Sequence, residues 1–415
     1  MSLAVLSLIV FLATVLIGIL TKVNCGLVAM ISSFILVEFF VKDMSLTDIY
    51  TKGWPAKIFF MMLAVTLLFG MAGANGTMEV IAKRIIRLMK GKSRLMPFFI
   101  FGLTFLLSAT GAGPGIAPMI MPIAMGICVE TGLSAFMMGT MIEAGAGAGG
   151  MSPIATNGII ASGFAAQVGA DDYIRMYIPY VLIMLVEAIG IYIFRGGYKV
   201  ENVPADAMKS ETPPMNRGQK LTAVVILCVI LSVIFFGMDV AAIAMAGAAV
   251  LLIFGVMKDR DAIRTVNWNT LMLVAGMFML ITIVDHCGGI NLISKVLMKF
   301  ITPRTGTGVM TLLSGLLAIV TSSSGVVMPT LIPVAGSIAR SMGHGVTSEL
   351  LIAGVCTGAN SAFYSPFSVL GSMTMSMYPD TVDRDKIFVR HLELTFVSIA
   401  FAAALAFLGF HQLFL

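Results

Sequence analysis

The sequence predicts an all-α polytopic membrane protein built from two inverted repeats, each with five transmembrane helices and one re-entrant hairpin. Three observations predict this fold: the chain is apolar throughout, its second half repeats its first, and polar segments interrupt both halves at matching places. Of the 415 residues, 58% are hydrophobic and 11% are charged, and the mean hydropathy is +0.99. Uncharged windows of about 20 residues recur, which is the length a helix needs to cross ~30 Å of hydrocarbon. A lipid bilayer is therefore the expected surroundings.

Two blocks carry the internal repeat. TGAGPGIAPMIMPIA at 110–124 returns as TSSSGVVMPTLIPVA at 321–335, with four of fifteen positions identical, including both prolines of a P-x-x-x-P pair. GAGAGGMSPIATNG at 145–158 returns as GANSAFYSPFSVLG at 358–371, and both contain S-P-x-x-x-x-G. Paired interruptions of apolar segments in two halves are the sequence feature that best indicates the binding site of a secondary transporter.

The repeat divides the chain into a first repeat at 1–194, a cytoplasmic linker at 195–219 and a second repeat at 220–415. In the first repeat we expect an amphipathic interfacial segment at 77–94, a hairpin at 95–129, and crossings at 2–20, 23–41, 57–72, 133–168 and 172–194. In the second we expect an interfacial segment at 290–302, a hairpin at 306–341, and crossings at 220–238, 240–257, 268–286, 347–377 and 386–413. The crossings 133–168 and 347–377 are expected to be broken helices at the midplane.

The charge distribution predicts the orientation. An odd number of crossings per half requires that the halves be inverted relative to each other. Cytoplasmic loops of membrane proteins are enriched in Lys and Arg. Placing the N- and C-termini outside puts 18 of the 26 Lys and Arg residues in the cytoplasm. These basic residues sit in short loops between spans, so no nucleic-acid partner is expected.

The hairpin tips and helix breaks are the expected binding site, because non-helical backbone at membrane depth is tolerated only where it faces protein or a cavity. Helix N-termini there hold an anion without any basic side chain. The expected substrate-binding residues are Thr110, Gly111, Gly113, Ser152, Thr321, Ser322, Ser323, Ser324, Asn360 and Ser365. The expected cation-binding residues are Gly113, Gly149, Thr156, Asn157, Ser324 and Ser361. The competing interpretation is that these small and hydroxyl residues pack helices closely and bond back to the backbone.

Ionisable residues inside spans are functional candidates, because they are costly to bury. Glu143 precedes the Gly run of the fourth crossing and is the candidate proton site. Glu187 lies mid-span, whereas Asp285, His286 and His391 are expected at the membrane interfaces. The sequence has no His/Asp/Glu cluster with metal-ligand spacing and no Ser-His pair, so neither an enzyme nor a resident cofactor is expected. A sodium ion, as coupling ion, is the one candidate metal.

At these motifs the chain resembles the ion transporter superfamily. The stretches LLFGMAGANGTMEVIAKRIIRLMKG at 67–91, LLSATGAGPGIAPMIMPIA at 106–124 and GAGAGGMSPIATNGII at 145–160 resemble the N-terminal region of the bacterial malonate/dicarboxylate carrier family. More distantly, the chain is similar to the divalent anion/sodium symporters. The resemblance implies a small anionic substrate, a multi-pass protein of a bacterial-type inner (plasma) membrane, and a homodimer. It also implies an elevator-type transporter, in which a domain of hairpins and broken helices slides against a scaffold.

The chain departs from the symporters at the hairpin tips. In that family each tip carries a Ser-Asn-Thr triplet ten residues before the hairpin proline. The corresponding residues here are Ala112-Gly113-Pro114 before Pro122 and Ser323-Ser324-Gly325 before Pro333. The first triplet is therefore absent and the second is only partly kept, so backbone N–H groups are expected to replace the missing side chains in the first tip.

The leading hypothesis is a secondary active transporter that imports a small dicarboxylate of the malonate or C4-dicarboxylate class, coupled to sodium or protons. The first alternative is a transporter of another anion or an inorganic ion, such as a monocarboxylate, a sulfonate or arsenite, or a sodium/proton exchanger. The missing triplet favours this alternative. The second alternative is the membrane subunit of a binding-protein-dependent uptake system.

Overall fold

The protein is entirely helical in the part of the chain that the computed structural model describes, which is 2–21, 23–87, 92–200, 202, 214–343, 345–379 and 382–415. No strand occurs within these ranges, so the all-α prediction is confirmed. Within these ranges, six helical segments are long and apolar enough to cross a membrane, and four shorter helices are also apolar. Lys22, part of the 77–94 segment and much of the predicted linker lie outside the described residues.

The helices of the first half follow the predicted order. They are α1 Leu3–Thr21, α2 Cys25–Phe39, α3 Leu46–Asp48, α4 Ala56–Ala74, α5 Thr77–Arg87, α6 Met96–Leu107, α7 Ala117–Thr131, α8 Ala135–Gly150, α9 Thr156–Gln167 and α10 Tyr173–Phe194. Short irregular turns η3 Ser108–Ala112 and η4 Gly113–Ile116 join α6 to α7. The α5 helix has one polar and one apolar face and carries a Glu79–Lys83 ion pair of 2.6 Å.

The second half has a similar series. Its helices are α11 Arg217–Phe236, α12 Val240–Ile253, α13 Asp259–Thr265, α14 Trp268–His286, α15 Gly289–Leu297, α16 Gly306–Ala318, α17 Met328–Met342, α18 Ser348–Ser361, α19 Val369–Ser376 and α20 Arg384–Phe407. The turn η7 Ser323–Val327 joins α16 to α17, and η8 Ala362–Tyr364 follows α18. The chain ends with η9 Phe410–Leu413.

Both long helices with S-P-x-x-x-x-G motifs are interrupted where the sequence indicates. The α8 helix begins at the Ser134 cap, whose side chain accepts a bond from the Met137 N–H, and it ends at Gly150. The next helix begins only at Thr156. In the second half, α18 ends at Ser361, and α19 begins after the Ser368 cap. These interruptions leave helix ends inside the protein.

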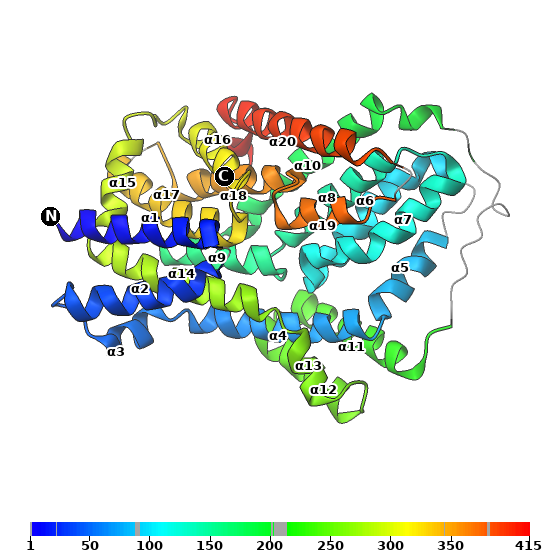
Figure 1. The fold of residues 1–415 in the computed structure, drawn as a ribbon, viewed down its shortest axis with the longest axis horizontal. Coiled ribbons are helices and arrows are strands. Elements are labelled where there is room, and N and C mark those ends of the chain that lie inside the picture. Colours follow the sequence, from blue (N-terminus) through cyan, green and yellow to red (C-terminus); the bar gives the residue numbers. More distant parts are fainter. Residues whose placement is uncertain are drawn as a thin grey trace.

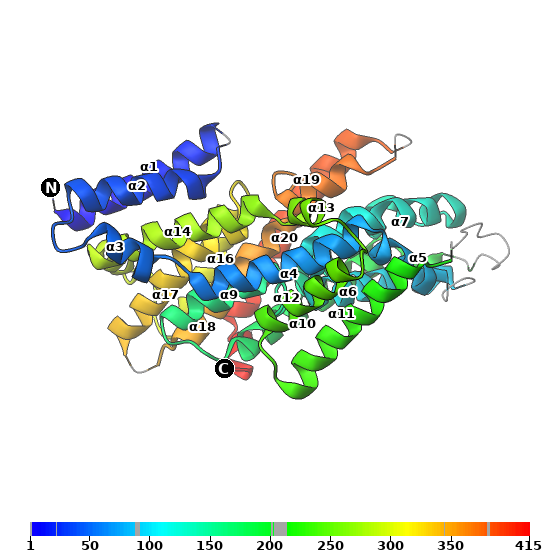
Figure 2. The same ribbon diagram turned by 90° about the horizontal axis from the view of Figure 1, so that it is seen from below.

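Equivalent helices of the two halves make equivalent contacts, and helices of one half also pack against helices of the other. The hairpin arm α6 packs against α8, and α16 packs against α18. The α2 helix of the first half packs against α14 of the second, and α4 packs against α12. Figure 1 shows most of the long helices running roughly along the longest axis, with α1 and α2 at one end and α5 to α7 towards the other. Figure 2 shows α1 and α2 together at one edge of the molecule.

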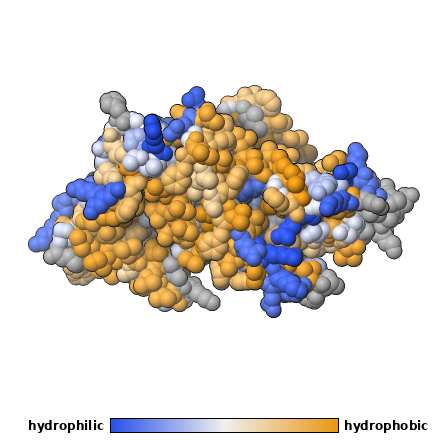
Figure 3. All heavy atoms as spheres, turned by 90° about the horizontal axis from the view of Figure 1, so that it is seen from above, coloured by the Kyte–Doolittle hydropathy of each residue, from blue (hydrophilic) through white to orange (hydrophobic). Residues whose placement is uncertain are grey.

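Glycines permit the closest helix contacts. A Cβ atom on Gly149 would collide with the Phe105 carbonyl of α6, and one on Gly358 would collide with the Thr311 carbonyl of α16. On the face that Figure 3 shows, the surface is mostly apolar in the middle of the long axis, and hydrophilic groups gather towards the ends. This distribution is expected of a multi-pass membrane protein, because the hydrocarbon core contacts the middle of each crossing.

Candidate substrate site

The interruptions of the two halves meet around a cavity of about 1120 Å³. The predicted site residues that line it are Gly111, Gly113, Thr156, Asn157, Thr321, Ser322, Ser323, Ser324 and Asn360. Both hairpin tips and both helix breaks contribute, although the residues of the two halves are more than 160 positions apart in the sequence. The structure therefore brings together most of the residues that the repeat singled out.

Helix N-termini converge on this cavity. The start of α7, with η4 leading into it, contributes Gly113 and Pro114, and the start of α9 contributes Thr156 and Asn157. In the second half, η7 leads into α17 and α19 begins beside the cavity; they contribute Ser322, Ser323, Ser324, Ser368 and Val369. Such ends carry unpaired N–H donors and the positive end of the helix dipole, so they stabilise a negative ligand.

The lining is polar but uncharged. Among its described residues there is no Asp, Glu, Lys, Arg or His. Polar side chains that the sequence interpretation missed include Asn24, Thr66, Asn267, Asn269 and Thr270. The Asn24 amide donates to the backbone carbonyl and side-chain oxygen of Asn269, at 2.7 and 2.6 Å. The signal that would have found these residues is an Asn at the start of an apolar segment in each half.

The first tip has a backbone that only glycine adopts easily. Gly111 has φ +122° and Gly113 has φ +63°, both in the left-handed region. A Cβ on Gly111 would lie 2.5 Å from the Phe69 ring of α4, so the tip packs against that helix. The absent triplet is therefore replaced by a turn that exposes backbone rather than side chains.

The motif serines of the two breaks do not line the cavity. Ser152 Oγ donates to the Ala109 carbonyl at 2.6 Å, and Ser365 Oγ donates to the Ile319 carbonyl at 3.1 Å. Each serine therefore ties its helix break to the end of the neighbouring hairpin arm. We call these two bonds the break latches. They match the competing interpretation, in which hydroxyls bond back to the backbone.

Three other predicted residues also lie outside the cavity lining. The Thr110 hydroxyl donates to the Leu107 carbonyl at 2.9 Å, and the buried Ser361 hydroxyl donates to the Thr357 carbonyl at 2.8 Å. Gly149 is buried where α8 meets α6. For these residues the described contacts are packing contacts within and between helices.

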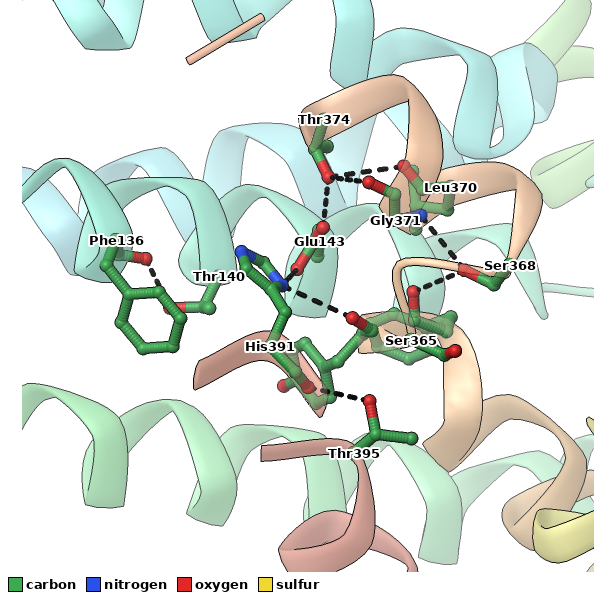
Figure 4. Close-up of polar contacts among 12 residues, drawn as sticks. Phe136, Thr140, Glu143, Ser365, Ser368, Leu370, Gly371, Thr374, His391 and Thr395 are labelled. Atoms are coloured by element: carbon green, nitrogen blue, oxygen red, sulfur yellow. Dashed lines mark hydrogen bonds and ion pairs between the residues drawn. The ribbon is translucent and has the colours of Figure 1, made fainter. Parts of the chain in front are cut away.

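The predicted proton site, Glu143, is fully buried and lies away from the cavity lining. Its Oε1 is hydrogen-bonded to the Thr374 hydroxyl of α19, and its Oε2 lies 3.3 Å from His391 Nδ1 of α20 (Figure 4). The other imidazole nitrogen, Nε2, is 3.0 Å from the Tyr378 hydroxyl. Three helices thus meet at a single buried carboxyl group.

The prediction that His391 is interfacial is wrong, because its side chain has no exposed surface. An α-helix rotates about 100° per residue, so Arg390 can face solvent while the next residue faces the interior. By contrast, His286 lies at the end of α14 and is 3.0 Å from Asp43, and both side chains are exposed. Glu187 of α10 accepts hydrogen bonds from the Ser398 hydroxyl at 2.8 and 3.0 Å.

Comparisons with known proteins agree with a transporter. Residues 1–150 match the family described as the dicarboxylate carrier protein MatC N-terminus. The arsenical pump membrane protein of Escherichia coli is 27% identical over 322 residues, covering 72% of each chain.

Two solved structures have a similar fold. The YdaH transporter of Alcanivorax borkumensis superposes with a TM-score of 0.61 at 15% identity, covering 88% of this chain and 87% of that one. MtrF of Neisseria gonorrhoeae, described within a class of antimetabolite efflux pumps, has a TM-score of 0.58 at 13% identity, covering 98% and 94% of the two chains. The chain is therefore similar to the dicarboxylate carrier MatC family over residues 1–150, to an arsenical pump membrane protein over 72% of its length, and in fold to two solved transporters.

Proposed function

We propose that this protein is a secondary active transporter that imports a small dicarboxylate of the malonate or C4 class, coupled to sodium or protons. The observation that carries the proposal is the convergence of helix N-termini on an uncharged cavity. A dicarboxylate needs donors for two carboxylate groups, and the start of a helix supplies unpaired N–H groups that need no counter-charge. The MatC match over 1–150 supports the dicarboxylate class.

Each half of the protein offers hydrogen-bond donors to one end of the substrate. The first-half donors are at the start of α9, at Thr156 and Asn157, beside the Gly113 turn whose own N–H donates to the Ser108 carbonyl. The second-half donors are the hydroxyls and backbone of Ser322 and Ser324. We propose that one carboxylate binds each half, so that the distance between the halves selects the length of the substrate.

A coupling cation would bind where carbonyl and hydroxyl oxygens are available at helix ends. Ser324 and Asn360 are the candidates of the second half, and Thr156 and Asn157 are those of the first. Hard cations such as sodium are held by oxygen ligands of this kind, in the way unwound helices hold Na⁺ in other transporters. In this proposal the ion neutralises the bound carboxylate and is carried with it.

We also propose that the hairpins and broken helices move as one body against the scaffold of the early helices, as an elevator, and that the protein is a homodimer. The support is the set of bonds that tie each hairpin to its own broken helix. Ser108 Oγ donates to the Ala146 carbonyl at 2.8 Å, and Ser323 Oγ donates to the Ala359 carbonyl at 2.5 Å. Together with the break latches, they keep each tip in register with its break.

The test is uptake of radiolabelled malonate and succinate by proteoliposomes, under an imposed sodium gradient and then under an imposed pH gradient. Concentrative uptake of either compound in one condition is the expected result. The arsenical pump relative favours a second candidate, transport of arsenite. Uptake of arsenite, with no uptake of either dicarboxylate, would support that candidate instead.

A further inference from the structure

The α19 helix separates the cavity from the buried Glu143–His391 pair. Leu370 and Met373 line the cavity from this helix, while Thr374 is hydrogen-bonded to Glu143. Figure 4 shows Thr374 on the side of α19 that points towards the carboxyl group. A hydrogen bond therefore links the buried carboxyl group to a helix that also lines the cavity.

Hydrogen bonding indicates how many protons the pair holds. If Glu143 were ionised beside a neutral His391, its Oε2 would have no hydrogen-bond donor in good geometry. A buried unpaired charge of that kind is strongly unfavourable. The His391 Nδ1 atom is also 3.2 Å from the Tyr364 carbonyl, which competes for the same N–H group.

One additional proton on the pair removes this buried unpaired charge. With the proton on Glu143, the carboxyl group donates to the Thr374 hydroxyl, which in turn donates to the Gly371 carbonyl at 2.9 Å. His391 then donates from Nδ1 to Tyr364 and accepts from Tyr378 at Nε2. With the proton on the imidazole instead, the pair is a neutral ion pair. Both arrangements have no net charge.

We propose that Glu143 and His391 together form a proton-binding site that is loaded in this conformation, and that the bound proton is carried with the substrate. The inference deepens the proposed function and rests on it, because it selects protons as a coupling ion. Release of the proton would leave a buried negative charge, so the deprotonated pair favours a conformation in which α19 has moved or water reaches Glu143.

A groove of about 360 Å³ lies beside the pair, although neither Glu143 nor His391 lines it. It lies between the α7–α8 turn and the start of α20, and Phe136 forms part of its wall. The same ring contacts His391 edge-on, with centroids 5.0 Å apart, and Arg195 lies over it at 4.5 Å. In the predicted orientation this groove opens to the cytoplasm.

The mouth of the groove carries charges of both signs. Lys386 is 2.9 Å from Asp383 and lowers the pKa of that carboxyl group, and Arg390 lies on the same helix. Two titratable groups interact with Glu143 itself, Tyr364 and Tyr378. Next to these lie Glu187 and Tyr180 beside Tyr364, and Cys128 beside Tyr378. Arg195, which lies over the Phe136 ring, interacts with Arg390 and Glu393.

The experiment measures malonate accumulation in sodium-free proteoliposomes with the membrane potential clamped at zero. If one proton moves with each substrate, a gradient of ~1 pH unit drives about tenfold accumulation by the wild type. Glu143→Gln imitates the protonated carboxyl group, so it should lose this accumulation and keep exchange of labelled for unlabelled malonate at equal pH. His391→Gln should also lose the pH-driven accumulation. Glu187→Gln is the matched control and should retain it.

Accumulation by Glu143→Gln under the pH gradient would overturn the proton site, and so would wild-type accumulation that responds to sodium alone.

If the wild type exchanges neither malonate nor succinate, the proposed function fails, and infrared spectroscopy still tests the proton site. A protonated-carboxyl band that is present in the wild type and in Glu187→Gln and lost in Glu143→Gln supports it, and so does an imidazolium band that is lost in His391→Gln. If neither variant loses a band, the proton site is overturned. If Glu143→Gln does not fold, the pH dependence of the protonated-carboxyl band is compared between His391→Gln and the wild type. A shifted pH dependence supports the proton site, and an unshifted one overturns it.

Discussion

Ser323 of the second hairpin tip donates a hydrogen bond to the carbonyl of Ala359 in α18, at 2.5 Å. The corresponding bond in the first half joins Ser108 to Ala146 of α8, at 2.8 Å. The accepting carbonyl lies within the last turn or so before each helix break. The tip of each hairpin is thus fixed to the broken helix of its own half, which is the arrangement expected of a unit that moves as a whole.

This bond separates the roles of two adjacent serines. Both serines line the cavity, but the Ser323 hydroxyl donates to the Ala359 carbonyl, whereas the Ser324 hydroxyl has no hydrogen-bond partner among the described residues. We expect Ser324→Ala to raise the Kd for substrate about 3- to 10-fold, because a neutral hydrogen bond contributes about 0.5–1.5 kcal/mol. Its unfolding temperature should stay at the wild-type value. Scintillation proximity binding in detergent measures the affinity.

Ser323→Ala is the matched control and should behave differently. Its main effect should be on stability, by about 1–3 kcal/mol, because the buried Ala359 carbonyl loses its side-chain donor. Equal affinity of Ser324→Ala and wild type would remove the second tip from the substrate site.

The break latches are expected to stabilise the fold, and removing one of them changes no charge. Ser365→Ala should lower the free energy of unfolding by about 1–3 kcal/mol, because Ser365 is fully buried and both donates and accepts hydrogen bonds. Ser372→Ala serves as the control, since that exposed hydroxyl bonds only within its own helix at Val369. Thermal unfolding in detergent, followed by circular dichroism, compares them. Identical transitions for the two variants would show that the latch contributes nothing.

The positions of the helices could be predicted because apolar length and interruption are local properties of the sequence. The predicted crossing at 172–194 corresponds to α10 Tyr173–Phe194, and the break predicted within the crossing 133–168 lies between α8 and α9. Which hydroxyl groups line the cavity was predicted less accurately from the sequence. Ser324 and Ser365 are equally polar in sequence, yet one lines the cavity and the other bonds a buried carbonyl.

Residues that meet only through tertiary packing could not be predicted. Asn24 and Asn269 are 245 positions apart and are hydrogen-bonded at the cavity. The sequence predicts His391 at the membrane interface, but in the structure its side chain is buried and lies beside Glu143. In both cases the partner, rather than the residue itself, decides the role, and the partner is distant in sequence.

The close contact of α16 with α18 predicts a strong effect of a single methyl group. A Cβ on Gly358 would overlap the Thr311 carbonyl, and Ser314 Oγ also lies within contact distance. Gly358→Ala should destabilise by about 1–3 kcal/mol, because the two backbones must separate. Gly126→Ala, in a helix where the added atom meets open space, should be neutral or stabilise by up to about 1 kcal/mol. Equal unfolding temperatures for the two variants would contradict the packing argument.

Asn157 allows stability and anion binding to be changed in opposite directions. It lies in the first turn of α9 and lines the cavity. A negative charge in the first turn of a helix is stabilising by about 0.3–1 kcal/mol, so Asn157→Asp should unfold at the wild-type temperature or above it.

The same charge should repel a bound dicarboxylate, since two unit charges ~4 Å apart repel by about 4 kcal/mol at an effective dielectric constant of ~20. Malonate binding should therefore weaken more than tenfold, whereas Asn157→Gln should stay within a few-fold of the wild type. Malonate affinity in Asn157→Asp equal to that of Asn157→Gln, at the pH where the new carboxyl group is ionised, would mean that the anion does not bind at the start of α9.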